Sequence, residues 1–391
     1  MPYVTDSVVH DADSHLMELP DSLDAYLDAK ARAQYDELPK LHRQPRDADY
    51  VRLARAQHDD PEFRAQANES ILLRKNYQAL GSFRPSDRTR ALDELGFASQ
   101  LVFTTWCLGN FDLDESSNIP LCYAVAHAHN QMISDFCAAD RRLLATGNVP
   151  LVDFERALTC ARTAIELGCK GLVIPSKCPP GHSPSHIHFD ALWALAQEAG
   201  LPILFHVGGE QKMNRDYFNN GLPNVKDFHG GEENFTSLSF MAIPHSAEQT
   251  LAALIFDGVL DRFPRLKFGA IELGASWLPS WMRYLDAGFA AFRKHEERLQ
   301  KLSLRPSEFA QRQLRVTPYP HEDVAWLIAN TGEEMLLFSS DYPHIEGGRN
   351  PIKRFNESLA PSPARAIQRF YRENFIDLMG EGLPRDLREL R

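Results

Sequence analysis

Short apolar runs alternate with amphipathic segments along most of the chain. The runs lack a polar residue at every second position, which is typical of strands that are buried on both faces of a parallel sheet. The segments between them place apolar residues at helical spacing, and several end at a glycine. The first strand is expected to end at Asp11–His15. The following strands are expected over 99–105, 143–150, 171–175, 202–207, 266–272, 314–318 and 335–339. Helices are expected over 88–96, 124–139, 153–168, 189–200, 239–263, 279–298, 321–330 and 365–380.

Two segments interrupt this alternation. Residues 24–90 are polar and are divided by prolines into short helices, so we interpret them as a helical insertion that forms a cap with little core of its own. Residues 208–236 form a long loop after the fifth strand and contain two pairs of glycines, Gly208–Gly209 and Gly230–Gly231. Long loops in compact domains are commonly functional, and we therefore predict that this one is a lid.

Eight strands with helices between them fit either a closed barrel or an open doubly wound sheet. Two observations favour the barrel: no G-x-G-x-x-G motif follows the first strand, and polar residues cluster at the carboxyl ends of the strands. The sequence therefore predicts one α/β domain, a (β/α)8 TIM barrel over residues 1–391, with the helical insertion at 24–90 and the lid at 208–236.

Composition and charge narrow the choice of partners. The formal net charge is -11 and no run of basic residues forms a patch, which argues against a nucleic-acid surface. The six cysteines are scattered without a CxxC pair, as is typical of reduced thiols. Acidic residues near the start argue against a signal peptide, and no apolar run reaches the roughly 18 residues that cross a bilayer. We expect a soluble cytoplasmic protein that binds a small-molecule substrate, with no nucleic-acid or membrane partner.

The predicted strand ends carry residues that commonly bind metals. Asp13 and His15 are two positions apart on a strand and therefore share a face, where a carboxylate and an imidazole make half of a divalent-metal site. His206 interrupts the apolar fifth strand, and Asp341 follows the eighth. Taken singly, these residues are also explained by a solvated strand exit, a buried histidine bonded to a carbonyl, and a turn or N-cap aspartate. Their occurrence together at one end of a barrel favours a metal site.

The same residues lie within a set of motifs that resembles the amidohydrolase superfamily. Within it, the chain is similar to the amidohydrolase-2 group, which includes aminocarboxymuconate-semialdehyde decarboxylase and resorcylate-type decarboxylases. The motifs are D-A-D-S-H, R-A-L-D-E-L-G, P-I-L-F-H, L-I-F-D-G-V-L-D-R-F-P-R-L-K and S-S-D-Y-P-H, in that order. They cover most of the chain outside residues 24–80 and the lid. The resemblance implies a metal-dependent barrel enzyme whose metal ligands are Asp13, His15, His206 and Asp341.

Two positions depart from the pattern of the group. Asp13 stands where many relatives have histidine or glutamate, and this extra carboxylate widens the metal choice toward harder ions such as Mn²⁺. Glu272 stands where the decarboxylases carry a catalytic histidine after the sixth strand. A glutamate beside a metal suits a base that takes a proton from water, which moves the interpretation toward hydrolysis. The simpler alternative is a structural glutamate that orients a neighbour.

Four further residues are candidates by position alone. His245 could donate a proton or could lie on a helix surface, and His344 could contact a metal ligand or the substrate. Lys177 follows the fourth strand and Trp106 the second, where they could bind an anionic and a flat part of a substrate. A solvated lysine and a tryptophan at the edge of the core are the simpler alternatives for that pair.

The leading functional hypothesis is a metal-dependent hydrolase that acts on an amide, ester, thioester or ring carbonyl of a small organic acid or its derivative. In it, Glu272 or His245 moves the proton, and Asp341 is a further catalytic candidate. The second hypothesis is a non-oxidative metal-dependent decarboxylase of an aromatic or unsaturated carboxylic acid, and the third is a non-catalytic metal-binding barrel. One divalent metal ion is expected, zinc in the first place and manganese or iron as alternatives. A homodimer is expected from the resemblance.

Overall fold

Seven parallel strands make up the sheet in the part of the chain that the structure describes, and each strand pairs with the one before it in sequence. The computed structural model describes residues 2–38, 48–69, 71–223 and 236–390. The strands are β1 (His10–Leu16), β2 (Ser99–Thr104), β3 (Leu143–Asn148), β4 (Gly171–Val173), β5 (Ile203–His206), β6 (Phe268–Ile271) and β7 (Leu314–Val316). All of them are buried along their whole length, as expected for a parallel sheet that is covered on both faces.

The eighth predicted strand, at 335–339, is an extended segment that closes the sheet into a barrel. On one side, the backbone N–H of Leu337 donates to the carbonyl of Val316 in β7 at 3.0 Å. On the other side, the N–H of Ala12 in β1 donates to the carbonyl of Phe338 at 3.1 Å. Its pairing consists of isolated bridges rather than a continuous ladder. The predicted barrel is therefore confirmed, with an irregular closing segment in place of a regular eighth strand.

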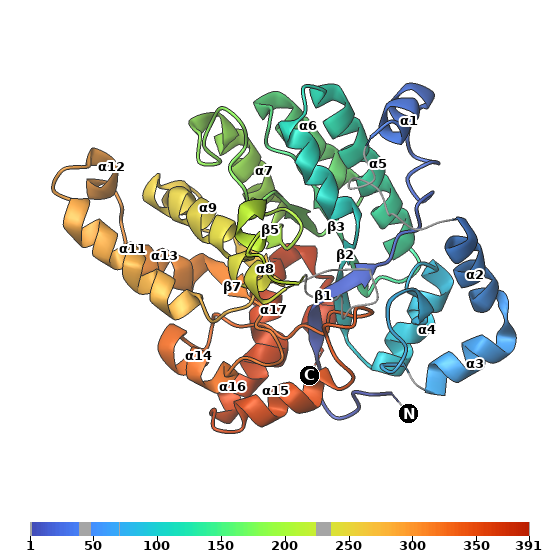
Figure 1. Ribbon diagram of the computed structural model, residues 1–391. Coiled ribbons are helices and arrows are strands. Elements are labelled where there is room, and N and C mark those ends of the chain that lie inside the picture. Colours follow the sequence, from blue (N-terminus) through green and yellow to red (C-terminus); the bar gives the residue numbers. More distant parts are fainter. Residues whose placement is uncertain (1, 39–47, 70, 224–235, 391) are drawn as a thin grey trace.

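Helices surround the sheet and cover its outer face (Figure 1). The outer helices follow the predicted pattern of caps and apolar stripes. Helix α6, for example, begins after Asp153, whose side chain accepts a hydrogen bond from the backbone N–H of Arg156. The helices that follow the insertion are α4 (Pro85–Leu95), α5 (Ile119–Cys137), α6 (Phe154–Glu166), α7 (Asp190–Ala199), α8 (Ser237–Ala242), α9 (His245–Phe256), α10 (Val259–Arg262), α11 (Leu278–Phe292), α12 (Glu297–Gln300), α13 (Pro306–Gln313), α14 (Val324–Thr331), α15 (Pro351–Leu359), α16 (Ala364–Gln368), α17 (Asn374–Met379) and α18 (Arg385–Arg388).

The prediction of one long helix over 239–263 is wrong. The structure divides this stretch into α8, α9 and α10. Pro244 separates the first two, because proline cannot donate the backbone hydrogen bond that a continuous helix needs. Gly258 separates the second and third and has a left-handed φ of 76°, a conformation that glycine adopts without strain. The predicted helix over 279–298 likewise ends at Phe292, with α12 as a separate turn.

The insertion is helical, as its polar and proline-rich sequence indicates. It contains α1 (Ala29–Asp36), α2 (Ala48–Asp59) and α3 (Pro61–Glu69). In Figure 1, α2 and α3 lie side by side near α4, whereas α1 lies apart from them beside α5. A small apolar cluster of its own joins Ala54 and Tyr77 to Met17 and Leu19, which follow β1. The predicted lid is described over 208–223, where η5 (Arg215–Phe218) is its one regular turn. The rest of the lid, including Gly230 and Gly231, lies outside the described residues.

The C-terminal segment closes the amino end of the barrel. The predicted helix over 365–380 is divided into α16, a π-helical turn (Arg369–Glu373) and α17. Phe375 of α17 stacks on His10 at the start of β1, with ring centroids 5.1 Å apart. Leu378 and Met379 belong to the same apolar cluster as the residues inside the barrel. The segment therefore packs against the barrel interior at its amino end and leaves the carboxyl ends of the strands for function.

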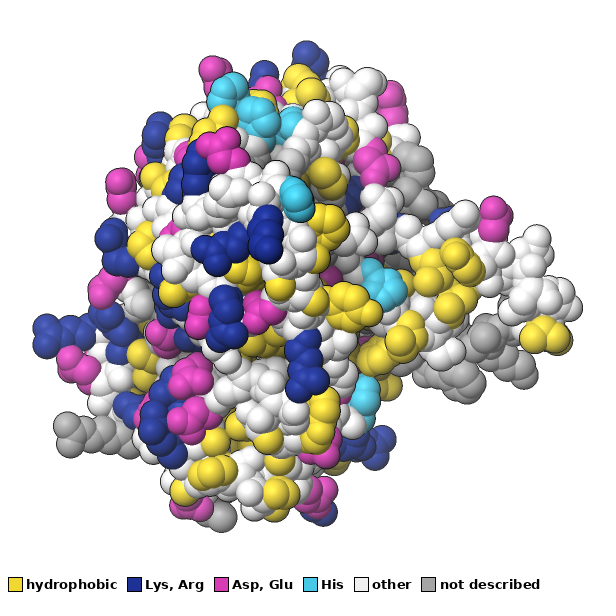
Figure 2. Space-filling model, turned by 90° about the vertical axis from the view of Figure 1, so that its left-hand side faces the viewer, with side chains coloured by type: hydrophobic (Ala, Val, Ile, Leu, Met, Phe, Trp, Pro, Cys, Tyr) yellow, Lys and Arg dark blue, Asp and Glu magenta, His cyan; other side chains and the backbone are white. Residues whose placement is uncertain are grey.

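The surface charges and the cysteines do not point to a particular function. Basic and acidic side chains are intermixed on the face that Figure 2 shows. None of the described helices is long and apolar enough to span a bilayer. All six cysteines are free thiols, and five are buried, whereas Cys178 is exposed.

Candidate metal centre

Six ionisable side chains converge at the carboxyl end of the barrel. The structure groups them into two overlapping sets in which one potential ligand atom from each residue lies within 4.8 Å of the others. All six residues are buried. The first set is Asp13, His15, His206 and Glu272, and the second is His15, Asp341 and His344. Three of the four expected ligands, Asp13, His15 and His206, therefore form one set with Glu272, whereas the fourth, Asp341, is linked to that set through His15 and is grouped with His344.

A bulge in β1 positions the first two members. The register between β1 and β2 shifts between Asp11 and Ser14. The regular alternation of side chains along the strand is therefore interrupted at Asp13. The result is close approach: Oδ1 of Asp13 lies 3.2 Å from Nε2 of His15. Bulges of this kind commonly re-aim side chains next to functional sites.

Asp11 holds the bulge to the closing segment. One oxygen of its carboxylate accepts the backbone N–H of Ser340 at 2.8 Å, and the other accepts the Ser340 hydroxyl at 2.6 Å. It also accepts from Nε2 of Gln100 at 2.8 Å and from the N–H of Asp13 at 3.3 Å. Because Ser340 directly precedes Asp341, this one carboxylate fixes both sides of the site. We did not anticipate this role, although Asp11 lies in the motif that marked the site.

Both central histidines present the same nitrogen to the centre. Nδ1 of His15 lies 3.3 Å from the carbonyl of Thr104, and Nδ1 of His206 lies 2.9 Å from the carbonyl of Val207. A carbonyl only accepts hydrogen bonds, so each Nδ1 carries the proton and each Nε2 keeps its lone pair. A backbone contact of this kind is the usual way in which a protein orients an imidazole that binds a metal.

The two Nε2 atoms lie close to the carboxylates of three residues, Asp13, Glu272 and Asp341. Nε2 of His15 lies 3.7 Å from Oε2 of Glu272 and 3.5 Å from Oδ1 of Asp341. Nε2 of His206 lies 3.3 Å from Oε2 of Glu272 and 3.4 Å from Oδ1 of Asp13. Bonds of about 2.0–2.2 Å to a shared cation place neighbouring donor atoms at similar separations.

Glu272 and Asp341 adopt an uncommon backbone conformation. Their φ angles are 55° and 52°, in the left-handed region that few residues other than glycine occupy. Contacts hold Glu272 in place, because its N–H donates to Oγ1 of Thr317 at 2.8 Å and its carbonyl accepts the hydroxyl of Tyr319 at 2.7 Å. Strain of this kind is concentrated at functional sites, where the surrounding structure maintains it.

Burial favours the neutral form of His15 at the centre. Burial, followed by the neighbouring His344, lowers the pKa of His15 to about 4. Burial would raise the pKa of Asp13, but the ring nitrogens of His15 and His206 beside it hold the pKa below its usual range. The carboxylates of Asp13, Glu272 and Asp341 face the Nε2 atoms of two imidazoles, and the buried Nε2 of His15 has no hydrogen-bond partner among the described residues. These donors fit a divalent cation, which would offset the repulsion among the carboxylates.

His344 links Asp341 to the second strand. Its Nδ1 lies 2.9 Å from Oδ1 of Asp341, and its Nε2 lies 2.9 Å from Oγ1 of Thr105. Its ring is also close to that of His15, with centroids 3.9 Å apart. Thr105 escaped our sequence reasoning, because a threonine that follows an apolar strand carries no specific signal.

Three predicted site residues lie outside this group. His245 is exposed at the start of α9. The ammonium of Lys177 pairs with Asp112 at 3.2 Å and Glu115 at 3.1 Å. The indole N–H of Trp106 donates to the hydroxyl of Tyr77 at 2.9 Å. The contacts of Lys177 and Trp106 join the loop after each strand to its surroundings.

The buried side chain of Glu18 binds the backbone that follows β2. Its carboxylate accepts the backbone N–H groups of Thr105, Trp106 and Cys107. It therefore shapes the loop after β2. Burial raises the pKa of the Cys107 thiol well above its ordinary value, which disfavours the thiolate that a nucleophilic cysteine needs.

Comparisons with known proteins identify the family and the fold. A family model described as Amidohydrolase matches residues 78–374, which is more than half of the chain. None of the curated proteins that were searched matches the chain significantly. Among solved structures, an amidohydrolase from Mycobacterium avium subsp. paratuberculosis is similar at a TM-score of 0.71 and 21% identity, covering 96% of this chain and 100% of that one.

Two decarboxylase structures are similar over comparable lengths. The 5-carboxyvanillate decarboxylase from Novosphingobium aromaticivorans, in complex with manganese, has a TM-score of 0.63 and 18% identity, covering 96% of each chain. The dihydroxybenzoic acid decarboxylase from Polaromonas sp., also with manganese, has a TM-score of 0.59 and 13% identity, covering 98% of this chain and 100% of that one. At these identities the similarity shows the barrel fold.

Proposed function

The chain belongs to the amidohydrolase family, and from this premise we propose that it is a metal-dependent decarboxylase of a hydroxylated aromatic or unsaturated carboxylic acid. One observation carries the proposal. Glu272 contacts both imidazoles and therefore lies among the candidate ligands, whereas Asp341 and His344 form a pair beside them. Decarboxylation needs a group that delivers a proton to carbon, and this pair is suited to that role.

The metal would be held by Asp13, His15, His206 and Glu272, with Asp341 as a further candidate ligand. When bound, a divalent ion supplies positive charge that orients the carboxylate and hydroxyl groups of the substrate and stabilises charge that develops on them. The sequence led us to expect zinc. The donor set of Asp13, His15, His206 and Glu272 has two carboxylates, which suit harder ions, and two of the similar decarboxylases contain manganese, so we propose Mn²⁺.

The reaction breaks the bond between the carboxylate carbon and the rest of the substrate. The electron pair of that bond stays on the substrate carbon, CO₂ leaves, and a proton takes its place. Asp341 is placed to hold this proton, because its carboxylate is buried against His344 at 2.9 Å. His344 in turn contacts the hydroxyl of Thr105, which orients its ring.

Further support for decarboxylation comes from the solved structures that are similar to this chain. Similar structures include decarboxylases of 5-carboxyvanillate and of dihydroxybenzoates, which are aromatic acids that carry a hydroxyl group. The absence of the histidine that the decarboxylases carry after the sixth strand is the main argument against this function. Its place is taken by Glu272, so the proton must come from another group, and Asp341 is the nearest candidate.

Hydrolysis is the second candidate function. It is favoured by the same Asp341, because a buried carboxylate beside a metal can take a proton from water as well as give one to carbon. Glu272 is less suited to be the base than we had expected from the sequence, because it faces both imidazole nitrogens.

The two functions are separated by product analysis. Protein loaded with Mn²⁺ is incubated in D₂O with a panel of ortho-hydroxylated aromatic carboxylates and, in parallel, with esters and amides of the same acids. The proposal predicts CO₂ release and one deuterium at the vacated carbon. Release of alcohol or amine without CO₂ would establish hydrolysis instead, and a metal-loaded protein that converts neither panel would favour the non-catalytic alternative.

A further inference from the structure

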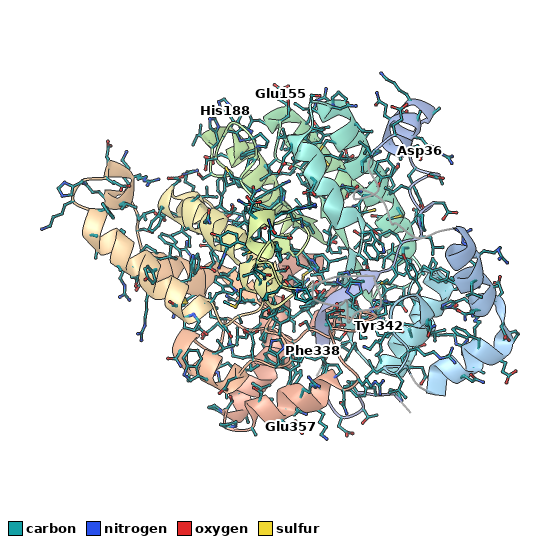
Figure 3. All side chains as sticks on the ribbon, viewed as in Figure 1. Asp36, Glu155, His188, Phe338, Tyr342 and Glu357 are labelled. Atoms are coloured by element: carbon teal, nitrogen blue, oxygen red, sulfur yellow. The ribbon has the colours of Figure 1, made fainter. Side chains whose placement is uncertain are left out.

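A cavity of about 720 Å³ lies between the insertion and α15, and none of the six residues of the metal centre lines it. We call it the basic cavity, because four cationic residues line it: Lys75, Arg349, Lys353 and Arg354. Its one lining carboxylate is Glu357. Figure 3 shows Glu357 at the lower edge of the molecule on α15, whereas Tyr342 lies toward the interior.

Lys75 is the innermost of these cations. Its Nζ atom is buried and has no hydrogen-bond partner among the described residues. Burial lowers the pKa of Lys75 to about 8, and the carboxylates of Asp341 and Glu346 limit this shift. An ammonium group that is buried without a bonded partner is unfavourable, so a ligand that supplies an oxygen anion would be stabilised here.

The outer wall adds charges that are open to a ligand. Arg349 and Arg354 are exposed, and neither forms an ion pair with any residue that the structure describes. Lys353 is also exposed and lies 3.8 Å from Glu357, which is a weak contact at the surface. Two guanidinium groups can bind a carboxylate or a phosphate through two parallel hydrogen bonds each.

The start of α15 lies at the same wall. Asn350 is its N-cap and accepts the N–H of Lys353 at 3.2 Å, and Pro351 occupies the first turn. The amino end of a helix carries a partial positive charge, which adds to the field of the side chains. The chain as a whole has a net charge of -11, so a cavity with four cations and one carboxylate stands out against its average surface.

We propose that the basic cavity binds an anion, namely a phosphate or carboxylate group of a small molecule, with Lys75 as its buried partner. The guanidinium groups of Arg349 and Arg354 bind the same group from the solvent side. No residue of the metal centre lines this cavity, and the proposal does not depend on the reaction that the metal centre catalyses.

The proposal is tested by calorimetric titration of the purified protein with inorganic phosphate and, separately, with malonate, at constant ionic strength. The wild type is expected to bind one equivalent of at least one probe. The probe that binds more tightly distinguishes a phosphorylated ligand from a carboxylate ligand. Lys75→Met keeps most of the side-chain volume and is expected to weaken binding at least tenfold, and Arg354→Gln to weaken it by a smaller factor.

Lys301→Met is the matched control, because Lys301 is an exposed lysine that pairs with Glu297 and does not line the basic cavity. It should bind the probe as the wild type does. Circular dichroism and thermal melting verify that each variant is folded. Because Arg354 is exposed, Arg354→Gln tests the site without disturbing the fold. Binding of neither probe by the wild type, or equal affinity in the wild type, Lys75→Met and Arg354→Gln, would overturn the proposal.

Discussion

The carboxylate of Glu272 and the imidazole of His206 meet across neighbouring strands, with Oε2 of Glu272 3.3 Å from Nε2 of His206. The same oxygen lies 3.7 Å from Nε2 of His15. A carboxylate that faces two ligand nitrogens is placed to share a cation with them. This relationship changes the role that we assign to Glu272, from a base to a metal ligand.

Replacement of Glu272 by glutamine tests this assignment. Glu272→Gln keeps the shape of the side chain but removes the charge, so we expect the affinity for Mn²⁺ to fall by at least about tenfold and activity to fall with it. The affinity is measured by competition with a chelator. Should Glu272→Gln lose activity while binding Mn²⁺ as tightly as the wild type, Glu272 would be a base and hydrolysis would regain weight.

His344 is predicted to assist proton transfer through Asp341. His344→Asn removes the ring nitrogen that contacts Asp341, and we expect kcat to fall by about 10²–10⁴-fold with little change in metal content. Thr105→Val is the companion variant, because it removes only the hydroxyl at 2.9 Å from Nε2 of His344. It should lower kcat less than His344→Asn does. A loss of metal from His344→Asn would instead make this histidine a ligand.

Much of the architecture was predictable because it depends on local patterns. Buried parallel strands are continuous apolar runs, and helices that cover them end at glycine or begin at a capping residue, so element order could be predicted from the sequence. The breaks at Pro244 and Gly258 were visible in the sequence but were outweighed by the apolar periodicity around them. The irregular closing segment was not predictable, because it pairs with β1, which is more than three hundred residues away in sequence.

The candidate site also contains residues that could be predicted from the sequence and residues that could not. Asp13, His15, His206 and Asp341 lie at strand ends, and the barrel topology brings such ends together. The geometry of Glu272 depends on a left-handed backbone that no sequence pattern indicated. Lys177 occupies a strand end as well, but nearby Asp112 and Glu115 pair with it, and only the tertiary structure shows that contact.

Asp11 is predicted to stabilise both the fold and the metal site. Asp11→Ala leaves the donors of Ser340 and Gln100 without their acceptor, and we expect a loss of roughly 2–4 kcal/mol in the free energy of unfolding, measured with urea. Because Ser340 precedes Asp341, we also expect weaker Mn²⁺ binding.

The control for Asp11 is Asp286→Ala. Asp286 likewise accepts a backbone N–H and a hydroxyl from one serine, Ser307, but it lies on α11 at the outside of the barrel. Its replacement should lower stability without any change in Mn²⁺ affinity. Equal effects of the two substitutions on Mn²⁺ affinity would contradict a specific role of Asp11.

The buried His129 is predicted to make the protein less stable in acid. Burial lowers its pKa to about 4, against about 6.5 in an unfolded chain, so the unfolded state binds a proton first as the pH falls. Its contribution to stability is therefore constant above about pH 6.5 and declines between pH 6.5 and 4, by roughly 3 kcal/mol over the whole interval.

The effect of His129 is measured as a difference between variants. Burial raises the pKa of Asp11 to about 7 and that of Asp114 to about 6, and these shifts act with the opposite sign in the same range. Urea unfolding of the wild type and of His129→Gln is therefore compared at pH 7 and pH 5, in the presence of a chelator. The wild type should lose stability relative to the variant at the lower pH, and a constant difference would contradict the prediction.

The central claim is that the buried group at the carboxyl end of the barrel holds one divalent metal ion. It is tested by titration of chelator-treated protein with Mn²⁺, followed by electron paramagnetic resonance, for the wild type and for the double variant His15→Ala, His206→Ala. We predict one tightly bound ion per chain in the wild type and none in the double variant. Binding of equal strength in both proteins, or no tight binding in the wild type, would contradict the account.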